Sequence, residues 1–116
     1  MKKILVTGCA GFIGSHLTEY LLLQKYNVTG IDNLSNGKLK NLESFQHQKN
    51  FKFINCDINN DKIDYILDEV DIVYHLAALA DIVPSIQKPS DYFWSNVYGT
   101  FNLIKNCNNK KIKKFI

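Results

Sequence analysis

The sequence of 116 residues contains no arginine, only two prolines and no long hydrophobic run. Its longest apolar stretches, such as residues 76–80, are a few residues long, whereas a membrane-spanning helix needs roughly 20. All 14 basic residues are lysines, so the bidentate guanidinium contacts that read bases and phosphates are absent. We therefore expect a chain that binds neither membranes nor nucleic acid.

Cysteine is also scarce. Cys9, Cys56 and Cys107 form no CxxC pair, and one thiol is left over under any pairing. This is typical of a reducing compartment, and no apolar signal-peptide core follows the first residues. We therefore expect a cytoplasmic chain with free thiols and no metal site.

The net charge of +3 comes from the end of the chain, where four lysines occupy the last seven positions. Without them, 14 minus 4 leaves 10 basic residues against 11 acidic ones, a net charge of −1. A local lysine cluster of this kind is typical of solvated surface rather than of a phosphate-binding stripe.

Short β-branched runs alternate with helical patterns, a rhythm typical of a parallel α/β sheet. The sequence predicts strands at residues 3–7, 27–31, 51–55, 71–76 and 113–116, and helices at residues 11–25, 39–46, 59–69 and 90–108. We expect a turn between Pro84 and Pro89. The expected fold is α/β, a Rossmann-type doubly wound parallel sheet forming one domain over residues 1–116. Because the fifth strand has barely begun when the chain ends, we expect the sheet to be truncated there and the natural fold to continue.

Helical spacing also marks an apolar face on two of the expected helices, and on the first of them this face can pack on the sheet. In the first expected helix the residues of this face are Ile13, Leu17, Tyr20, Leu21 and Leu23. In the last expected helix, Phe93, Val97, Phe101 and Ile104 recur at helical spacing.

A glycine-rich turn, TGCAGFIG at residues 7–14, joins the first expected strand to the first expected helix. At such a turn the backbone can approach the pyrophosphate of a dinucleotide closely. Gly8 permits the tight turn, Gly11 leaves room for the phosphates and Gly14 lets the helix pack closely on the sheet. The amides and the dipole at the helix start favour the negative charge, so the sequence predicts a dinucleotide site.

Two aspartates indicate which dinucleotide. Asp32 stands 18 residues past Gly14, at the end of the second expected strand, where a carboxylate accepts hydrogen bonds from ribose hydroxyls. It would repel a 2′-phosphate, and no arginine offsets that repulsion, so NAD is predicted rather than NADP; a turn or helix-capping role is the alternative. Asp57 follows the third expected strand and is placed to reach the adenine amino group, or to cap the following helix.

Five stretches carry a family resemblance: TGCAGFIG, IDNLSNGKLKNL, CDI, HLAALADIVPSIQKP and NVYGTFNLI. Together they resemble, over the whole chain, the NAD-dependent epimerase/dehydratase family of extended short-chain dehydrogenases/reductases. The loop of residues 32–37, followed by Asn41 and Leu42, looks most like that of UDP-sugar 4-epimerases of the UDP-glucose/galactose, UDP-glucuronate or N-acetyl type. The dTDP-glucose 4,6-dehydratases usually carry a different loop there and are the alternative.

The resemblance implies a set of NAD contacts by position. Phe12 and Ile13 would serve the pyrophosphate, residues 32–37 the adenosine ribose, Asp57 and Ile58 the adenine, and residues 76–80 the nicotinamide side. Taken alone, the apolar LAALA run would be core, and His75 would be a satisfied buried histidine. The full set of implied cofactor contacts is Gly8, Gly11, Phe12, Ile13, Gly14, Asp32, Asn33, Leu34, Ser35, Asn36, Gly37, Asp57, Ile58, Leu76, Ala77, Ala78, Leu79, Ala80 and Asn96, with Val83, Ser85 and Ile86 as candidate sugar contacts.

The resemblance also implies a reaction in which tightly bound NAD oxidises C4 of a UDP-sugar transiently and the hydride returns to the opposite face. The family uses Ser/Thr and a YxxxK motif, but none of the six tyrosines here has a lysine four positions on. In relatives that motif follows the fifth strand, so the catalytic residues and the substrate domain are expected beyond this chain.

We therefore expect the NAD-binding portion of a nucleotide-sugar 4-epimerase that is inactive by itself. The alternatives are the same portion of a nucleotide-sugar 4,6-dehydratase or reductase, and a non-catalytic NAD-binding module. Relatives commonly form homodimers through helices of this region, and helical spacing does not tell whether Trp94 and Phe101 belong to the core or to such an interface.

Overall fold

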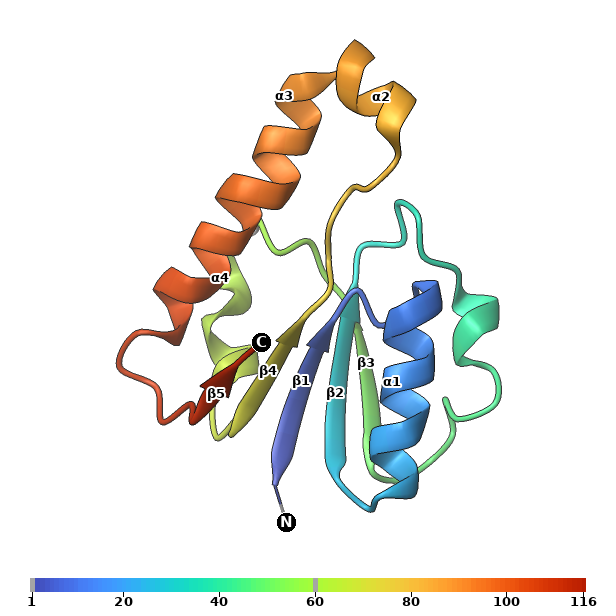
Figure 1. The fold of residues 1–116 in the computed structure, drawn as a ribbon. Coiled ribbons are helices and arrows are strands. Elements are labelled where there is room, and N and C mark those ends of the chain that lie inside the picture. Colours follow the sequence, from blue (N-terminus) through green and yellow to red (C-terminus); the bar gives the residue numbers. More distant parts are fainter. Residues whose placement is uncertain (1, 60) are drawn as a thin grey trace.

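The computed structural model describes residues 2–59 and 61–116 as one parallel sheet with helices on both faces (Figure 1). The strands are β1 (Lys3–Thr7), β2 (Asn27–Asp32), β3 (Phe51–Asn55), β4 (Ile72–His75) and β5 (Lys114–Phe115). Their order in the sheet is β3-β2-β1-β4-β5, and every neighbouring pair is parallel. The predicted Rossmann-type α/β fold is confirmed.

The helical segments are shorter and more varied than the predicted ones. They are α1 (Phe12–Leu23), η1 (Leu39–Leu42), η2 (Asp61–Leu67), α2 (Ile82–Gln87), α3 (Pro89–Tyr92), η3 (Phe93–Tyr98) and α4 (Gly99–Cys107). The segments η1 and η2 are 3-10 helices, and η3 is a π-helical stretch between α3 and α4. Asn60, which falls in the helix predicted at residues 59–69, lies outside the described residues.

The prediction of a turn between Pro84 and Pro89 is wrong, because α2 occupies most of that stretch. Pro84 is the third residue of α2. The first N–H groups of a helix have no partner within it, so a proline there costs no hydrogen bond.

An apolar cluster covers each face of the sheet. On one face α1 and the chain around η1 contribute Leu22 and Phe45, and on the other η2 and α4 contribute Ile63 and Leu103. The central strand β1 is buried on both sides, with Leu5 fully inaccessible, as a parallel sheet between two helical layers requires.

The face of α1 that packs on the sheet differs in part from the predicted one, because Leu17 and Leu21 pack on the core as predicted and the other three residues do not. Ile13, Tyr20 and Leu23 are 68%, 58% and 65% exposed. The start of α1 lies so close to the glycine-rich turn that only small residues, Gly14 and Ser15, fit against it. The residues three to four positions further along the helix lie on the same face and are therefore buried as well. The buried residues of α1 are Gly14, Ser15, Thr18, Leu21 and Leu22.

Part of the lysine cluster near the end of the chain is paired with acidic side chains. Lys110 forms ion pairs with Asp64 and Asp68, and Lys113 lies 3.7 Å from the Asp71 carboxylate. Exposed pairs of this kind contribute little to stability, because water and salt screen them. Within the described part of the chain, no helix combines the length and the hydrophobicity needed to cross a bilayer.

Candidate functional site

A cleft of about 790 Å³ opens where β1, β2, β3 and β4 end. Its lining includes Gly8, Asp32, Cys56 and Leu76, each of which lies at or just beyond the carboxyl end of one of these strands. Strand order reverses between β1 and β4. Open parallel sheets bind ligands at such a switch point, outside the carboxyl ends of their strands.

The glycine-rich turn forms one wall of the cleft. Gly8 has φ +70°, and a Cβ there would lie 2.9 Å from the backbone nitrogen of Ala77. A Cβ on Gly11 would meet only the Gly8 carbonyl oxygen, at 3.3 Å, so this glycine leaves open space on the cleft side. Gly11 is also the N-cap of α1 and offers no side-chain cap. The first N–H groups of α1 are therefore available to an anion.

Asp32 ends β2 and is only 9% exposed. Its Oδ2 accepts the N–H of Ala10 at 3.0 Å, and its Oδ1 accepts the N–H of Leu34 at 2.8 Å. A Cβ on Gly37 would lie 2.7 Å from Oδ2, so the loop folds back closely over the carboxylate. An ionised carboxylate has about four acceptor sites. Two sites remain after these bonds, which is enough for the two hydroxyls of a ribose.

A third wall follows β4. Leu76 and Ala77 donate their backbone N–H groups to Thr7 Oγ1, at 2.9 and 3.0 Å. Asn96 holds Leu79 with two hydrogen bonds of 2.8 Å, accepting its N–H and donating to its carbonyl oxygen. The apolar LAALA run is not core, since every residue in it is exposed or half-buried and all five line the cleft.

The turn after β3 closes the cleft. Asp57 Oδ1 accepts the N–H of Asn59 at 2.9 Å, and Asn102 on α4 donates to the Ile58 carbonyl oxygen at 2.8 Å. Asn59 Oδ1 is buried and has no hydrogen-bond partner in the described part of the chain. This oxygen and the exposed Asp57 carboxylate are acceptors for a donor such as an adenine amino group.

The structure brings most of the predicted cofactor residues into this one cleft. They come from four segments of the chain that lie far apart in the sequence and meet at the ends of four strands (Figure 1). The predicted residues that line it are Gly8, Gly11, Phe12, Asp32, Asn33, Ser35, Asn36, Gly37, Asp57, Ile58, Leu76, Ala77, Ala78, Leu79 and Ala80.

Seven predicted residues lie outside the cleft lining. Ile13 is exposed beside the cleft, and Gly14 packs against Gly8. The Leu34 side chain packs on the core cluster beneath α1, with its backbone at φ +63°. Asn96 uses its amide to hold Leu79. The candidate sugar contacts Val83 and Ser85 lie on α2 outside the cleft lining, Val83 exposed and Ser85 half-buried, and the same holds for exposed Ile86.

The structure adds residues that the sequence did not predict. Thr7 directly precedes the first glycine of the turn, and its hydroxyl holds the backbone of Leu76 and Ala77. The sequence shows its position in the motif but does not indicate these hydrogen bonds. Asp81, the N-cap of α2, and Asp91 on α3 also line the cleft, and no local spacing indicates this. The cleft residues not predicted are Ile31, Cys56, Asn59, Asp81, Asp91, Trp94 and Ser95.

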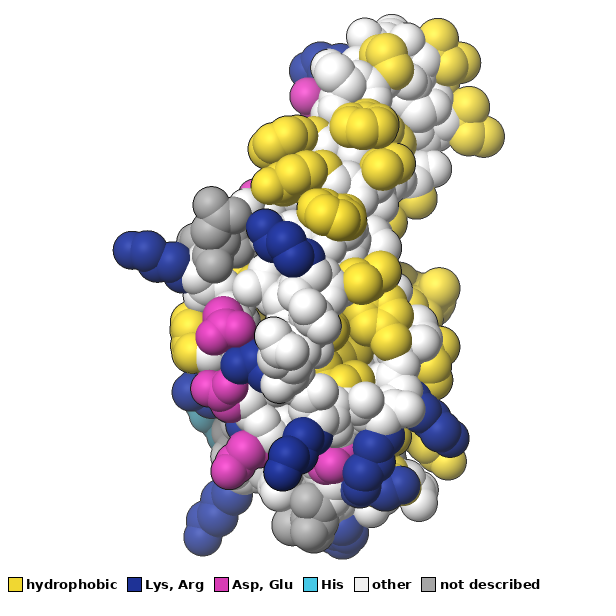
Figure 2. Space-filling view, turned by 90° about the vertical axis from the view of Figure 1, so that its left-hand side faces the viewer, with side chains coloured by type: hydrophobic (Ala, Val, Ile, Leu, Met, Phe, Trp, Pro, Cys, Tyr) yellow, Lys and Arg dark blue, Asp and Glu magenta, His cyan; other side chains and the backbone are white. Residues whose placement is uncertain are grey.

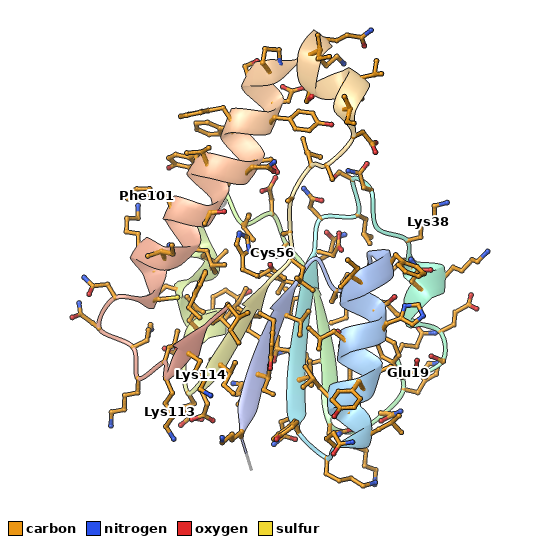
Figure 3. All side chains as sticks on the ribbon, viewed as in Figure 1. Glu19, Lys38, Cys56, Phe101, Lys113 and Lys114 are labelled. Atoms are coloured by element: carbon orange, nitrogen blue, oxygen red, sulfur yellow. The ribbon has the colours of Figure 1, made fainter. Side chains whose placement is uncertain are left out.

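The cysteines are poor candidates for nucleophilic chemistry. Burial, reinforced by the Asp32 carboxylate, raises the pKa of Cys9 to about 12. Burial, followed by the Asp57 carboxylate, also raises the pKa of Cys56, which directly follows the edge strand β3 and is labelled in Figure 3. Both thiols stay protonated near neutral pH, whereas the thiolate is the reactive form.

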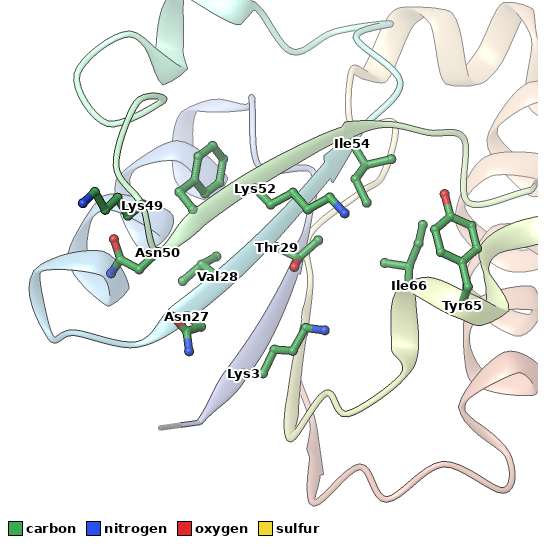
Figure 4. A pocket seen from close by; sticks show the side chains of 11 residues that line it. Lys3, Asn27, Val28, Thr29, Lys49, Asn50, Lys52, Ile54, Tyr65 and Ile66 are labelled. Carbon is green, nitrogen blue, oxygen red and sulfur yellow. The ribbon is translucent and has the colours of Figure 1, made fainter.

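A smaller hollow of about 250 Å³ lies at the opposite, amino ends of β2 and β3 (Figure 4). Three lysines, Lys3, Lys49 and Lys52, border it together with Tyr65 on η2. It contains none of the predicted site residues.

Known proteins of similar sequence and structure act on nucleotide sugars. The family model described as GDP-mannose 4,6 dehydratase matches residues 5–116. The structure of the UDP-N-acetylglucosamine 4-epimerase from Methanobrevibacter ruminantium M1 is 40% identical over 98% of this chain and 36% of that chain, with a TM-score of 0.89. The structure of DesIV, a dTDP-glucose 4,6-dehydratase from Streptomyces venezuelae with NAD and TYD bound, is 30% identical over 97% of this chain and 38% of that chain, with a TM-score of 0.92.

Among curated proteins, UDP-glucuronic acid decarboxylase 1 of Danio rerio is 38% identical over 103 residues, which are 89% of this chain and 24% of that protein. The chain thus spans between 24% and 38% of the length of these three relatives. They share the part of the protein that forms this cleft, while their reactions differ.

Proposed function

The chain belongs to the NAD-dependent epimerase/dehydratase family, and from this premise we propose that it is the NAD-binding portion, a single domain, of a nucleotide-sugar 4-epimerase. The observation that carries the proposal is the convergence of the glycine-rich turn and Asp32 on one cleft. The uncapped start of α1 suits a pyrophosphate, and the carboxylate suits a ribose.

The remaining cofactor contacts follow from this placement. Asp57, Ile58 and the unpartnered Asn59 oxygen would hold the adenine. The small residues of the segment at 76–80 would admit the nicotinamide side of the dinucleotide. When bound, NAD supplies the hydride acceptor for oxidation of the sugar at C4.

The epimerase activity is supported by the loop of residues 32–37, which resembles that of UDP-sugar 4-epimerases, and by the 40% identity to the UDP-N-acetylglucosamine 4-epimerase structure. Identity alone does not separate the two activities, because it is 29–40% for the epimerase structures and 30–36% for the dehydratases. The dehydratase alternative is supported by the description of the matching family model. Because no tyrosine of this sequence has a lysine four positions on, we propose that the 116-residue chain alone turns over no sugar.

Mass spectrometry of the reaction products tests this proposal on the complete gene product. Purified protein is incubated with NAD and, separately, with UDP-glucose, UDP-N-acetylglucosamine, UDP-glucuronate and dTDP-glucose. We expect a product of unchanged mass and altered retention from a UDP-sugar, because epimerisation at C4 alters only stereochemistry.

Other outcomes would be as clear. Loss of one water from dTDP-glucose indicates a 4,6-dehydratase, and loss of carbon dioxide from UDP-glucuronate indicates a decarboxylase. The 116-residue chain serves as the control, and turnover by that chain, free of host enzyme, contradicts its proposed inactivity.

We also propose that the complete protein is a homodimer that associates through η3 and α4. Five large apolar side chains on these segments are between 51% and 60% exposed. Figure 2 shows hydrophobic side chains gathered along this helical column, and Figure 3 shows Phe101 pointing away from the sheet. The Trp94 and Tyr98 rings stack at 4.3 Å. The five residues are Phe93, Trp94, Val97, Phe101 and Ile104.

Phe101→Asp is expected to convert this dimer to a monomer, because it places a charge in the centre of an apolar contact. Sedimentation velocity of the complete protein measures the change. Tyr65→Asp is the matched control, since Tyr65 is an equally exposed aromatic residue, 60%, on another surface, and we expect it to leave the dimer intact. A wild-type protein that sediments as a monomer contradicts the proposal.

A further inference from the structure

His75 makes contacts that the proposed cofactor site does not explain. It is the last residue of β4 and directly precedes the segment of residues 76–80 that lines the cleft. Its Nδ1 lies 2.7 Å from Thr7 Oγ1 on β1, and its Nε2 lies 2.7 Å from Thr100 Oγ1 on α4. The ring therefore bridges the sheet and the helix that covers it.

The hydrogen bonds of Thr7 fix the protonation of Nδ1. A hydroxyl has one proton to donate and two lone pairs that accept. Both lone pairs of Thr7 Oγ1 are used by the N–H groups of Leu76 and Ala77. The Thr7 proton must therefore point to His75, so Nδ1 accepts it and carries no proton of its own.

The other ring nitrogen is fixed in the same way. Thr100 Oγ1 donates its proton to the Asn96 carbonyl oxygen at 2.6 Å. It can then only accept from His75, so Nε2 carries the ring proton. The bonding pattern thus selects the neutral imidazole with the proton on Nε2.

These bonds control the geometry of the cleft. The segment after β4 packs on the glycine-rich turn so closely that a Cβ on Gly8 would lie 2.9 Å from the nitrogen of Ala77. Thr7 holds Leu76 and Ala77 from one side, and Asn96 holds Leu79 from the other. His75 connects these two attachments through Thr7 and Thr100, and the hydroxyl protons of both threonines are already committed.

We propose that neutral His75 is a positioning residue that keeps the segment of residues 76–80 in its dinucleotide-binding arrangement, and that protonation of its ring weakens cofactor binding. The inference rests on the proposed NAD site. A proton on Nδ1 would face the Thr7 oxygen, whose lone pairs are already occupied. It would have to displace the N–H of Leu76, which also lies 3.2 Å from the Thr7 main-chain oxygen, or that of Ala77, and the segment would lose one of its hydrogen bonds to the Thr7 hydroxyl.

The surroundings of the ring favour its neutral form. Thr7 faces it from β1, Thr100 from α4 and the Phe115 ring from β5, with centroids 5.9 Å apart. The main-chain oxygen of Ile116 accepts the backbone N–H of His75, and the lysines of β5 and α4, Lys114 and Lys105, are exposed. Burial lowers the pKa of His75 from the ordinary 6.5. The ring is therefore neutral near neutral pH, and we expect cofactor binding to weaken only as the pH falls through this lowered pKa of His75.

Isothermal titration of the complete protein with NAD, from about pH 8 down to about pH 5.5, tests this proposal. The wild-type dissociation constant is expected to rise below pH 6.5, by up to about tenfold per pH unit because one proton is linked to binding. His75→Asn keeps an acceptor near the Nδ1 position but cannot titrate, so we expect a flat profile and a loss of only a few-fold near neutral pH. His47→Asn, which removes an exposed histidine remote from the cleft, is expected to keep the wild-type profile.

A second measurement keeps this inference separate from the proposed function. Histidine side-chain NMR is expected to show the Nε2–H form of His75, and the Leu76 and Ala77 amides are expected to lose protection on acidification. These signals do not require NAD. If NAD fails to bind at any pH, the proposed function is wrong while the NMR still tests the positioning role. An Nδ1–H ring, or a His75→Asn profile that matches the wild type, would overturn the role of His75.

Discussion

Replacing Gly14 with alanine is expected to prevent the chain from folding. A Cβ at this position would lie 2.0 Å from the Gly8 carbonyl oxygen and 2.8 Å from its carbonyl carbon. Both atoms are backbone, so neither can rotate away, and α1 would have to move off the sheet. We expect Gly14→Ala to be one of the exceptional substitutions that lower the free energy of unfolding by more than about 4 kcal/mol. Such a loss approaches the total stability of about 5–15 kcal/mol typical of a small domain. Circular dichroism and urea unfolding of the purified variant would measure the loss.

Gly11→Ala is the matched control, because it adds the same methyl group three residues earlier in the same turn. There the nearest atom is the Gly8 carbonyl oxygen at 3.3 Å, which a small backbone shift relieves. We expect Gly11→Ala to stay folded, within about 1 kcal/mol of wild type, and to bind NAD at least tenfold more weakly, since the methyl group enters the space reserved for the pyrophosphate. A folded Gly14→Ala protein, or a Gly11→Ala protein that binds NAD normally, would contradict these assignments.

The sheet and the glycine-rich turn could be predicted because their signals are local. Each strand is a short β-branched run, and the turn is a spacing of glycines between a strand and a helix. The position of Asp32 follows from the same spacing, since the end of β2 must lie beside the end of β1. The location of the cleft could therefore be predicted, because it is formed by the carboxyl ends of strands that the sequence already indicates.

Features that depend on packing were not predictable from local patterns. Apolar spacing on α1 indicated a face with Ile13 and Tyr20, but the close approach of Gly14 to Gly8 turns another face to the sheet. The LAALA run has the composition of a core strand, yet β4 ends at His75 and the run continues as the cleft wall. Asn96 was predicted to contact the cofactor, and its amide holds Leu79, seventeen residues earlier in the sequence. Only the folded chain reveals this pairing.

Asp32→Asn is expected to weaken NAD binding by about 10- to 100-fold and to reduce the preference for NAD over NADP. Hydrogen bonds to a charged group contribute about 1.5–3 kcal/mol each, and the substitution removes the charge that would bind the ribose hydroxyls. It also removes the charge that would repel a 2′-phosphate. The dissociation constants of both dinucleotides, measured by isothermal titration on the complete protein, give the affinity and the preference together.

The same substitution should lower stability, because the carboxylate accepts two backbone N–H groups, those of Ala10 and Leu34. An amide has one oxygen, so its NH₂ group must face one of these donors, and an unsatisfied buried donor costs about 1–3 kcal/mol. Asp91→Asn removes a carboxylate from the same cleft, on α3, and is the control for the general effect of charge. We expect Asp91→Asn to change the ratio of the NAD and NADP dissociation constants less than Asp32→Asn does. If it changes the ratio as much, Asp32 does not bind the ribose hydroxyls specifically, and the preference for NAD arises from the net negative charge of the cleft.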